Sequence, residues 1–192
     1  MNKTLYIMVG ISGAGKTEFV KSKLIKGPGW YHVSRDTIRF ALLGETDKYF
    51  DHEEEVYNKF TQTIAKELQN DNNYYVVADA THLNKGSRMK LLNSLKNSGI
   101  DLTTIDIIPI MMRTDIIESI RRNEQREGLA KVPTNIIKSM SKSLTDPSTD
   151  DYKYTAIMYV DNGPHYTEKP KFMYKKNDIR MKEISIKDVI KK

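Results

Sequence analysis

The sequence predicts an α/β fold in which a parallel sheet is flanked by helices, and two observations indicate it. Short runs of β-branched and aromatic residues alternate with longer amphipathic stretches, which is the pattern of βαβ units. The first run, residues 5–9, leads directly into the glycine-rich stretch Gly10-Ile11-Ser12-Gly13-Ala14-Gly15-Lys16-Thr17. This stretch has the spacing G-x-x-x-x-G-K-[ST] of a phosphate-binding loop between a strand and a helix, so we expect the P-loop NTPase type of α/β fold.

The expected strands lie at residues 4–9, 31–34, 74–78 and 103–110, where short runs of β-forming residues occur. Helices are expected between and after them, at residues 15–26, 36–43, 52–69, 85–97 and 115–126. The first helix ends at Gly27-Pro28-Gly29, because proline cannot continue a helix and glycine accepts a left-handed cap. Pro133 begins a further helix at residues 134–144, whose apolar side chains recur at helical spacing. After a turn-rich linker at residues 146–151, strands are expected at 154–160 and near 171–174, with a closing helix from Ser185.

Composition and charge limit the classes of protein. The 192 residues include no cysteine, and the N-terminus lacks a charged and then apolar leader. The longest apolar run, residues 107–112, contains Pro109 and is far too short to cross a bilayer, so we expect a soluble cytoplasmic protein with no membrane partner. The formal net charge of +6 lies in the last 24 residues, which hold 9 Lys and Arg against 3 Asp and Glu. This basic segment either lies along a polyanion or is a solvated surface.

The glycine-rich loop predicts a site for a nucleoside triphosphate, ATP or GTP. Small residues let consecutive backbone N–H groups wrap a phosphate, and the following helix points its positive end at the same anion. Lys16 is expected to reach the β- and γ-phosphates, and Thr17 to ligate Mg²⁺. The candidate nucleotide-binding residues of this loop are Gly10, Ser12, Gly13, Ala14, Gly15, Lys16 and Thr17.

A candidate catalytic acid follows the second strand, in the sequence Ser34-Arg35-Asp36-x-x-Arg39. Strands of open α/β sheets bring side chains to their carboxyl ends, where ligands bind. Asp36 could there accept the proton of an attacking hydroxyl and contribute to a metal site, or it could serve only as a helix N-cap. Arg39 lies one helical turn further on, where a guanidinium suits a phosphate carried by the substrate.

The third strand ends in Asp79-Ala80-Thr81, next to the phosphate loop. An acid in this position commonly supports Mg²⁺ or its waters, although it could also cap the next turn. Arg88 lies one helical turn beyond Asn84 and could join the substrate site or be a solvated side chain of its helix. The candidate metal ligands are therefore Thr17, Asp36 and Asp79, and the candidate substrate contacts are Arg39, Asp79, Thr81 and Arg88.

A cluster of arginines at residues 121–126, followed by Gly128, is the last candidate feature. Arg122 and Arg126 are four residues apart, so on one helix they would share a face and could clamp a triphosphate together. Gly128 offers a hinge. Phosphoryl transfer depends on positioning and positive charge, which makes both arginines catalytic candidates. The alternative is an exposed basic helix end, which the helix dipole favours.

Five motifs taken together resemble a known family. They are GISGAGKT, YHVSRDTIR, ATHLN, RRNEQREGLAKVP and the helix NIIKSMSKS. In order and spacing they are similar to the 5′-kinase domain of bacteriophage polynucleotide kinases, over about residues 1–145. The resemblance implies transfer of the γ-phosphate of ATP to the 5′-hydroxyl of DNA or RNA. It also implies roles for Asp36 as general base, Arg39 on the acceptor phosphate, Arg122 and Arg126 on the ATP phosphates, and Val132 near the adenine.

Two departures from that family leave the acceptor open. Ala80 stands where the phage enzymes place an acid, and the resulting D-A-T form is similar to the broader group of small P-loop kinases. The sequence also lacks the D-x-D-G-T motif of the phage phosphatase domain, so we expect no 3′-phosphatase activity. A kinase for a nucleoside, sugar or other metabolite is therefore an alternative, as is a non-enzymatic ATP-dependent switch or nucleic-acid-binding module.

We therefore expect a P-loop kinase domain over residues 1–146, with a helical lid at about residues 119–133. A small basic extension, residues 147–192, is expected to pack on the same domain. The expected function is that of a Mg²⁺-dependent polynucleotide 5′-kinase of the nucleic-acid repair type, located in the host cytoplasm if phage-encoded. Its expected partner is a nucleic acid with a 5′-hydroxyl end, and the sequence leaves a homo-oligomer open.

Overall fold

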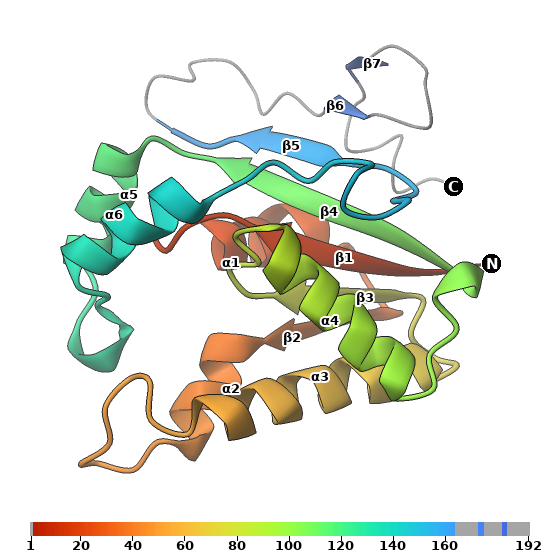
Figure 1. The fold of residues 1–192 in the computed structure, drawn as a ribbon, viewed down its shortest axis with the longest axis horizontal. Coiled ribbons are helices and arrows are strands. Elements are labelled where there is room, and N and C mark those ends of the chain that lie inside the picture. Colours follow the sequence, from red (N-terminus) through yellow and green to blue (C-terminus); the bar gives the residue numbers. More distant parts are fainter. Residues whose placement is uncertain (1, 164–172, 175–181, 184–192) are drawn as a thin grey trace.

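The computed structural model describes residues 2–163, 173–174 and 182–183. Its centre is a sheet of five parallel strands in the order β2-β3-β1-β4-β5, with helices on both faces (Figure 1). The predicted P-loop NTPase type of α/β fold, a parallel sheet flanked by helices, is confirmed. The strands of this sheet are β1 (Lys3–Val9), β2 (Trp30–Ser34), β3 (Tyr75–Asp79), β4 (Ile105–Arg113) and β5 (Met158–Asp161).

The helices occupy most of the connections between these strands. They are α1 (Lys16–Phe19) with the π-helical turn η1 (Val20–Leu24), α2 (Arg35–Leu42), α3 (Glu53–Gln69), α4 (Lys85–Asn97), α5 (Ile116–Glu124) and α6 (Thr134–Ser143). Two short 3₁₀ turns are η2 (Leu102–Thr104) and η3 (Gly128–Ala130). A separate antiparallel pair joins β6 (Met173–Tyr174) to β7 (Lys182–Glu183). None of the helices in the described part of the chain is both long and apolar enough to cross a bilayer.

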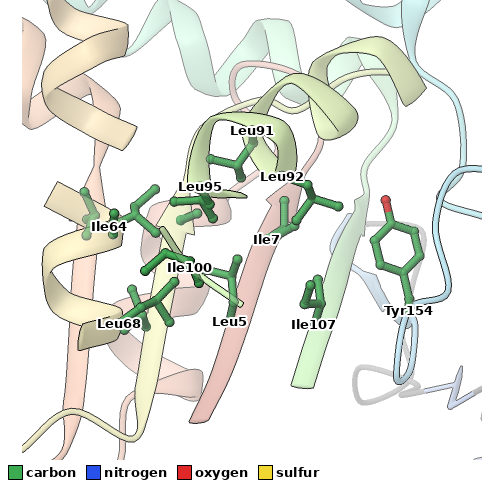
Figure 2. Packing of buried hydrophobic residues seen from close by; sticks show 14 of the residues in the cluster. Leu5, Ile7, Ile64, Leu68, Leu91, Leu92, Leu95, Ile100, Ile107 and Tyr154 are labelled. Atoms are coloured by element: carbon green, nitrogen blue, oxygen red, sulfur yellow. The ribbon is translucent and has the colours of Figure 1, made fainter. Parts of the chain in front are cut away.

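The central strand β1 divides the core into two layers, because successive side chains of a strand point to opposite faces. Leu5 and Ile7 pack under α3 and α4, in a cluster with Ile64 and Leu68 of α3 and with leucines of α4 (Figure 2). Tyr6 and Met8 belong to the cluster on the other face, with side chains of α1, η1 and α6. Burial of each large aliphatic side chain contributes roughly 1.5–3 kcal/mol, so packing on the sheet holds the helices in place.

Several elements differ from those expected. The helix expected at residues 15–26 is divided into α1 and η1 and stops at Ile25, whose extended backbone precedes the Gly27-Pro28-Gly29 turn. Strand β4 continues three residues beyond the expected end at Ile110, because it is paired on both sides, with β1 and with β5. Helix α5 ends two residues earlier than expected, at Glu124. The expected closing helix from Ser185 lies outside the described residues.

Candidate active site

A cavity of about 360 Å³ lies at the carboxyl ends of β1, β2 and β3. This is the edge at which open α/β sheets bind their ligands. Its walls come from the phosphate loop, the start of α2, the turn before α3, the end of β3 and the segment before α6. Of the predicted site residues, those that line it are Ser12, Gly13, Gly15, Lys16, Thr17, Asp36, Arg39, Asp79, Thr81, Arg126 and Val132.

The phosphate loop joins β1 to α1, and its conformation requires two of its glycines. Gly13 and Gly15 have φ angles of 82° and 85°, in the left-handed region that favours glycine. A Cβ atom at Gly13 would lie 2.2 Å from the carbonyl oxygen of Ser119, and one at Gly15 would lie 2.3 Å from Nδ2 of Asn162. Asn162 Nδ2 also donates a 2.9 Å hydrogen bond to the carbonyl oxygen of Ala14. The loop is therefore held between α5 and the residue that follows β5.

Lys16 lies within this loop. Its Nζ atom donates hydrogen bonds to the carbonyl oxygens of Gly10, at 3.0 Å, and Ile11, at 2.8 Å. Burial lowers the pKa of Lys16, while the nearby carboxylates of Asp79 and Asp36 oppose that shift. The ammonium group is thus placed where the loop would surround a phosphate, with one acid from the end of β3 and one from the first turn of α2 close enough to balance its charge.

Thr17 and Asp79 form the candidate metal site. Thr17 Oγ1 donates a 2.7 Å hydrogen bond to Asp79 Oδ2, which also lies 3.0 Å from His32 Nε2. Burial alone would raise the pKa of Asp79, but the hydrogen bonds from His32 and Thr17 and the charge of Lys16 outweigh it and lower this pKa. Mg²⁺ is usually bound by one or two protein oxygens together with phosphate oxygens. The hydroxyl of Thr17 and the ionised carboxylate of Asp79 therefore fit this ion.

Asp36 lies in the first turn of α2, but it is not the N-cap. The cap is Ser34, whose Oγ accepts a hydrogen bond of 3.2 Å from the backbone N–H of Thr37. Asp36 Oδ1 accepts hydrogen bonds from Arg39 Nη1, at 2.7 Å, and from the hydroxyl of Tyr49, at 2.8 Å, and neither bond uses Oδ2. The interpretation of Asp36 as only a helix cap is therefore wrong. Its carboxylate forms part of the cavity wall.

Arg39 holds this wall together. Its Nη1 bonds to both Asp36 and Tyr49, its Nη2 donates a 2.7 Å hydrogen bond to Glu53 Oε2, and the guanidinium lies 4.2 Å from the centre of the Tyr49 ring. Arg35 forms an ion pair with the other carboxylate oxygen of Glu53. Glu53, the first residue of α3, therefore joins two arginines of α2. Only 4% of Arg39 is exposed, so the predicted substrate contact is a side chain already bonded within the protein.

The two arginines of the expected lid lie in different environments. Arg126 lines the cavity, and its Nη1 donates a 3.1 Å hydrogen bond to Ser12 Oγ. Arg122 does not line it, and its Nε donates a 2.6 Å hydrogen bond to Glu118 Oε1. A guanidinium nitrogen of Arg122 nevertheless lies 3.3 Å from where a Cβ of Gly15 would stand. Because α5 ends before Arg126, the prediction that these two arginines share one helix face is wrong.

Val132 is fixed at the edge of the cavity by a side chain of α5. Asn123 Oδ1 accepts a 3.0 Å hydrogen bond from the backbone N–H of Val132, and Asn123 Nδ2 donates a 2.7 Å bond to its carbonyl oxygen. The carbonyl oxygen of Thr81, two residues beyond the end of β3, accepts a 2.9 Å hydrogen bond from the backbone N–H of Gly10. The segment before α6 is thus bonded to α5, and the residues after β3 are bonded to the start of the phosphate loop.

Arg88 is not part of the cavity, which corrects its prediction as a substrate contact. Its side chain has no exposed surface, and it forms a close ion pair with Asp151, to which Nε donates at 2.8 Å. Nη1 donates a 2.9 Å hydrogen bond to the carbonyl oxygen of Thr145. A buried charge must be paired and hydrogen-bonded. Arg88 therefore anchors the segment after α6 to α4.

Sequence reasoning missed several residues of the cavity and its surroundings. Tyr49 and Phe50 stand out only as adjacent aromatic residues in a polar loop, and Glu53 only as the start of an acidic run. Met140 lies on α6, where its helical spacing indicates a core residue. Asn162 follows β5 and carries no local signal of its contact with the phosphate loop.

This parallel sheet, with a phosphate loop, a strand-end carboxylate and a hydroxyl beside it, defines the class of protein as a P-loop domain of the kinase type, a nucleotide-binding fold. The chain belongs to the AAA_33 family, described as an AAA domain, whose model matches residues 5–147.

Solved structures share this fold. A chain of the Pnkp1/Rnl/Hen1 RNA repair complex matches with a TM-score of 0.58 and 20% identity, over 74% of this chain and 44% of that chain. A fungal RNA kinase matches with a TM-score of 0.56 and 15% identity, over 87% of this chain and 77% of that chain. The complex of AvrRxo1-ORF1 and ORF2 with ATP matches with a TM-score of 0.59 and 12% identity, over 92% of this chain and 61% of that chain. This chain thus spans less than half of the repair-complex chain, and at these identities the likeness is one of fold.

Proposed function

We propose that this chain is a Mg²⁺-dependent polynucleotide 5′-kinase that transfers the γ-phosphate of ATP to the 5′-hydroxyl of DNA or RNA. The observation that carries the proposal is the position of Asp36 on the wall of the cavity that the phosphate loop also lines. One oxygen of its carboxylate is held by Arg39 and Tyr49. A base fixed beside a triphosphate cradle is what in-line transfer to a hydroxyl requires.

In the proposed reaction, Asp36 takes the proton of the acceptor hydroxyl while that oxygen forms its bond to the γ-phosphorus. The bond from this phosphorus to the β–γ bridging oxygen breaks, and ADP leaves. Lys16 and Arg126 would stabilise the charge on the transferring group, since fixed positive charge is the main contribution of a protein to this chemistry. Thr17 and Asp79 would hold Mg²⁺, which neutralises charge on the phosphate oxygens.

The choice of a polynucleotide as acceptor has two supports. One is the set of motifs that resemble the phage 5′-kinases, which extends well beyond the phosphate loop. The other is that the structures of similar fold include an RNA kinase and an RNA repair complex. We further propose that residues 147–163 belong to the kinase domain, because β5 extends the same sheet by pairing with β4.

The test is a phosphoryl-transfer assay with ATP labelled at the γ-phosphate, Mg²⁺ and a 5′-hydroxyl oligonucleotide, run beside a panel of nucleosides and sugars. Label should appear on the 5′-hydroxyl oligonucleotide and not on the same oligonucleotide with a 5′-phosphate. Transfer only to a nucleoside or sugar would replace the proposal with a metabolite kinase. Retention of ATP without transfer to any hydroxyl would indicate a switch rather than an enzyme.

A further inference from the structure

Three aromatic side chains pack against one another beside the cavity, and two of them, Tyr49 and Phe50, line it. Phe40 lies on α2, and Tyr49 and Phe50 lie in the loop that leads to α3. The Tyr49 and Phe50 rings meet edge to face, with centroids 4.8 Å apart and planes at 84°, and Phe40 meets Tyr49 at 6.3 Å and 67°. Phe40 and Phe50 nevertheless stay 41% and 54% exposed, which is high for large apolar side chains. We call these three residues the aromatic wall.

The aromatic wall is bonded to the proposed general base. The hydroxyl of Tyr49 donates a 2.8 Å hydrogen bond to Asp36 Oδ1, and the Tyr49 ring carries the Arg39 guanidinium on its face. Tyr49 and Phe50 both line the cavity that contains Asp36. A molecule that places a hydroxyl at Asp36 therefore has the exposed ring of Phe50 beside it.

We propose that the aromatic wall binds the nucleobase of the terminal nucleotide of the acceptor, with the base stacked on Phe50. This inference rests on the proposed function and adds to it a means of holding the acceptor. Every base offers a π face to an aromatic ring, so stacking is tolerant of sequence. The wall would therefore accept any base, in DNA or in RNA, while Asp36 takes the proton from the 5′-hydroxyl of the same nucleotide.

A sugar or another small polar acceptor fits this wall less well. Such a molecule needs hydrogen-bond partners for its hydroxyls once it leaves water. The Tyr49 hydroxyl and the terminal nitrogens of Arg39 already bond to Asp36 and Glu53. The remaining exposed surface of the wall comes from the apolar rings of Phe40 and Phe50, of which Phe50 lines the cavity, and an aromatic ring suits a flat base.

The test compares kinase activity of Phe50→Ala and Phe50→Trp on two 5′-hydroxyl oligonucleotides, one intact and one with an abasic terminal nucleotide. We expect Phe50→Ala to raise the KM for the intact oligonucleotide roughly 5- to 100-fold, the range of base–aromatic stacking. It should leave the KM for the abasic oligonucleotide and for ATP unchanged. Phe50→Trp, which keeps an aromatic ring, should have a KM for the intact oligonucleotide close to that of the wild type. The matched control is Tyr31→Ala, an aromatic residue 39% exposed on β2 and outside the cavity lining, which should change none of these values.

A binding measurement makes the test independent of turnover. An intact oligonucleotide with 2-aminopurine as its 5′-terminal base should lose fluorescence when it binds the wild-type chain, because stacking quenches this base, and should not lose it with Phe50→Ala. If the wild-type chain phosphorylates oligonucleotides but Phe50→Ala changes neither KM nor quenching, the aromatic wall has another occupant and the inference is wrong. An equal rise in KM for intact and abasic oligonucleotides would also overturn it. If the wild-type chain phosphorylates no polynucleotide, the proposed function itself fails.

Discussion

Thr17 Oγ1 and Asp79 Oδ2 are joined by a hydrogen bond of 2.7 Å, although 62 residues separate them in the chain. The bond connects the first turn of α1 to the end of β3. Strands β1 and β3 are hydrogen-bonded neighbours, with Ile7 paired to Ala78. The sheet therefore fixes the phosphate loop and the acid relative to one another, which is the rigidity that a site for Mg²⁺ and a triphosphate needs.

The first prediction concerns this pair. Asp79→Asn keeps the shape of the side chain but removes its charge, so the Mg²⁺ concentration for half-maximal activity should rise roughly 10- to 100-fold. Thr17→Ser keeps the hydroxyl and is the matched control, with Mg²⁺ dependence close to that of the wild type. Initial rates measured over a series of Mg²⁺ concentrations decide the matter. An unchanged dependence in Asp79→Asn would remove this carboxylate from the metal site.

The second prediction concerns the proposed general base. Asp36→Asn keeps the hydrogen-bonding shape of the wall but cannot accept a proton, so kcat should fall roughly 10²- to 10⁴-fold. The Kd for ATP should change little, because the phosphate loop is untouched. Asp71→Asn is the control, since the side chain of Asp71 is fully exposed and does not line the cavity. Parallel loss of ATP binding and turnover would show that Asp36 is structural.

The third prediction separates the two lid arginines. Arg126→Ala should lower kcat/KM for ATP roughly 10²-fold or more, because Arg126 lines the cavity and a removed stabilising donor costs about this much. Arg122→Ala should cost less, since Glu118 already holds that guanidinium. Steady-state kinetics of both variants against the wild type provide the measurement. Equal losses would instead support a clamp formed by both arginines.

The sheet and the phosphate loop could be predicted because both follow from local patterns. Short apolar runs that alternate with amphipathic stretches define the strands. Ligands of open α/β sheets bind at the carboxyl ends of the strands, and this rule correctly places Asp36 and Asp79 at the cavity. The π-helical turn after α1 was not predictable in this way, because the residues Val20–Leu24 have the same apolar spacing as an α-helix.

The side-chain partners of Arg39 and Arg88, by contrast, depend on contacts between distant segments. Arg39 meets Glu53 and Tyr49 only because the loop before α3 folds back onto α2, and nothing in the spacing of these residues indicates that. Arg88 was a candidate substrate contact, with a solvated side chain of its helix as the alternative, because it lies one helical turn beyond Asn84. Its partner, Asp151, is 63 residues away in a segment with the composition of an exposed linker.

The last prediction concerns the dependence of stability on pH. His82 Nδ1 lies 2.8 Å from the carbonyl oxygen of Met8, and burial lowers the pKa of His82 from 6.5 to about 4. Between these values the unfolded chain binds a proton that the folded chain does not, so the free energy of unfolding should fall as the pH decreases from 6.5 to 4. The loss should be on the order of 3 kcal/mol. His82→Asn removes the titration and tolerates the left-handed φ of 39° at this position. Urea unfolding of both proteins at pH 7.5 and pH 4.5 should therefore show a larger loss in the wild type, and equal losses would mean that protonation of His82 does not limit stability.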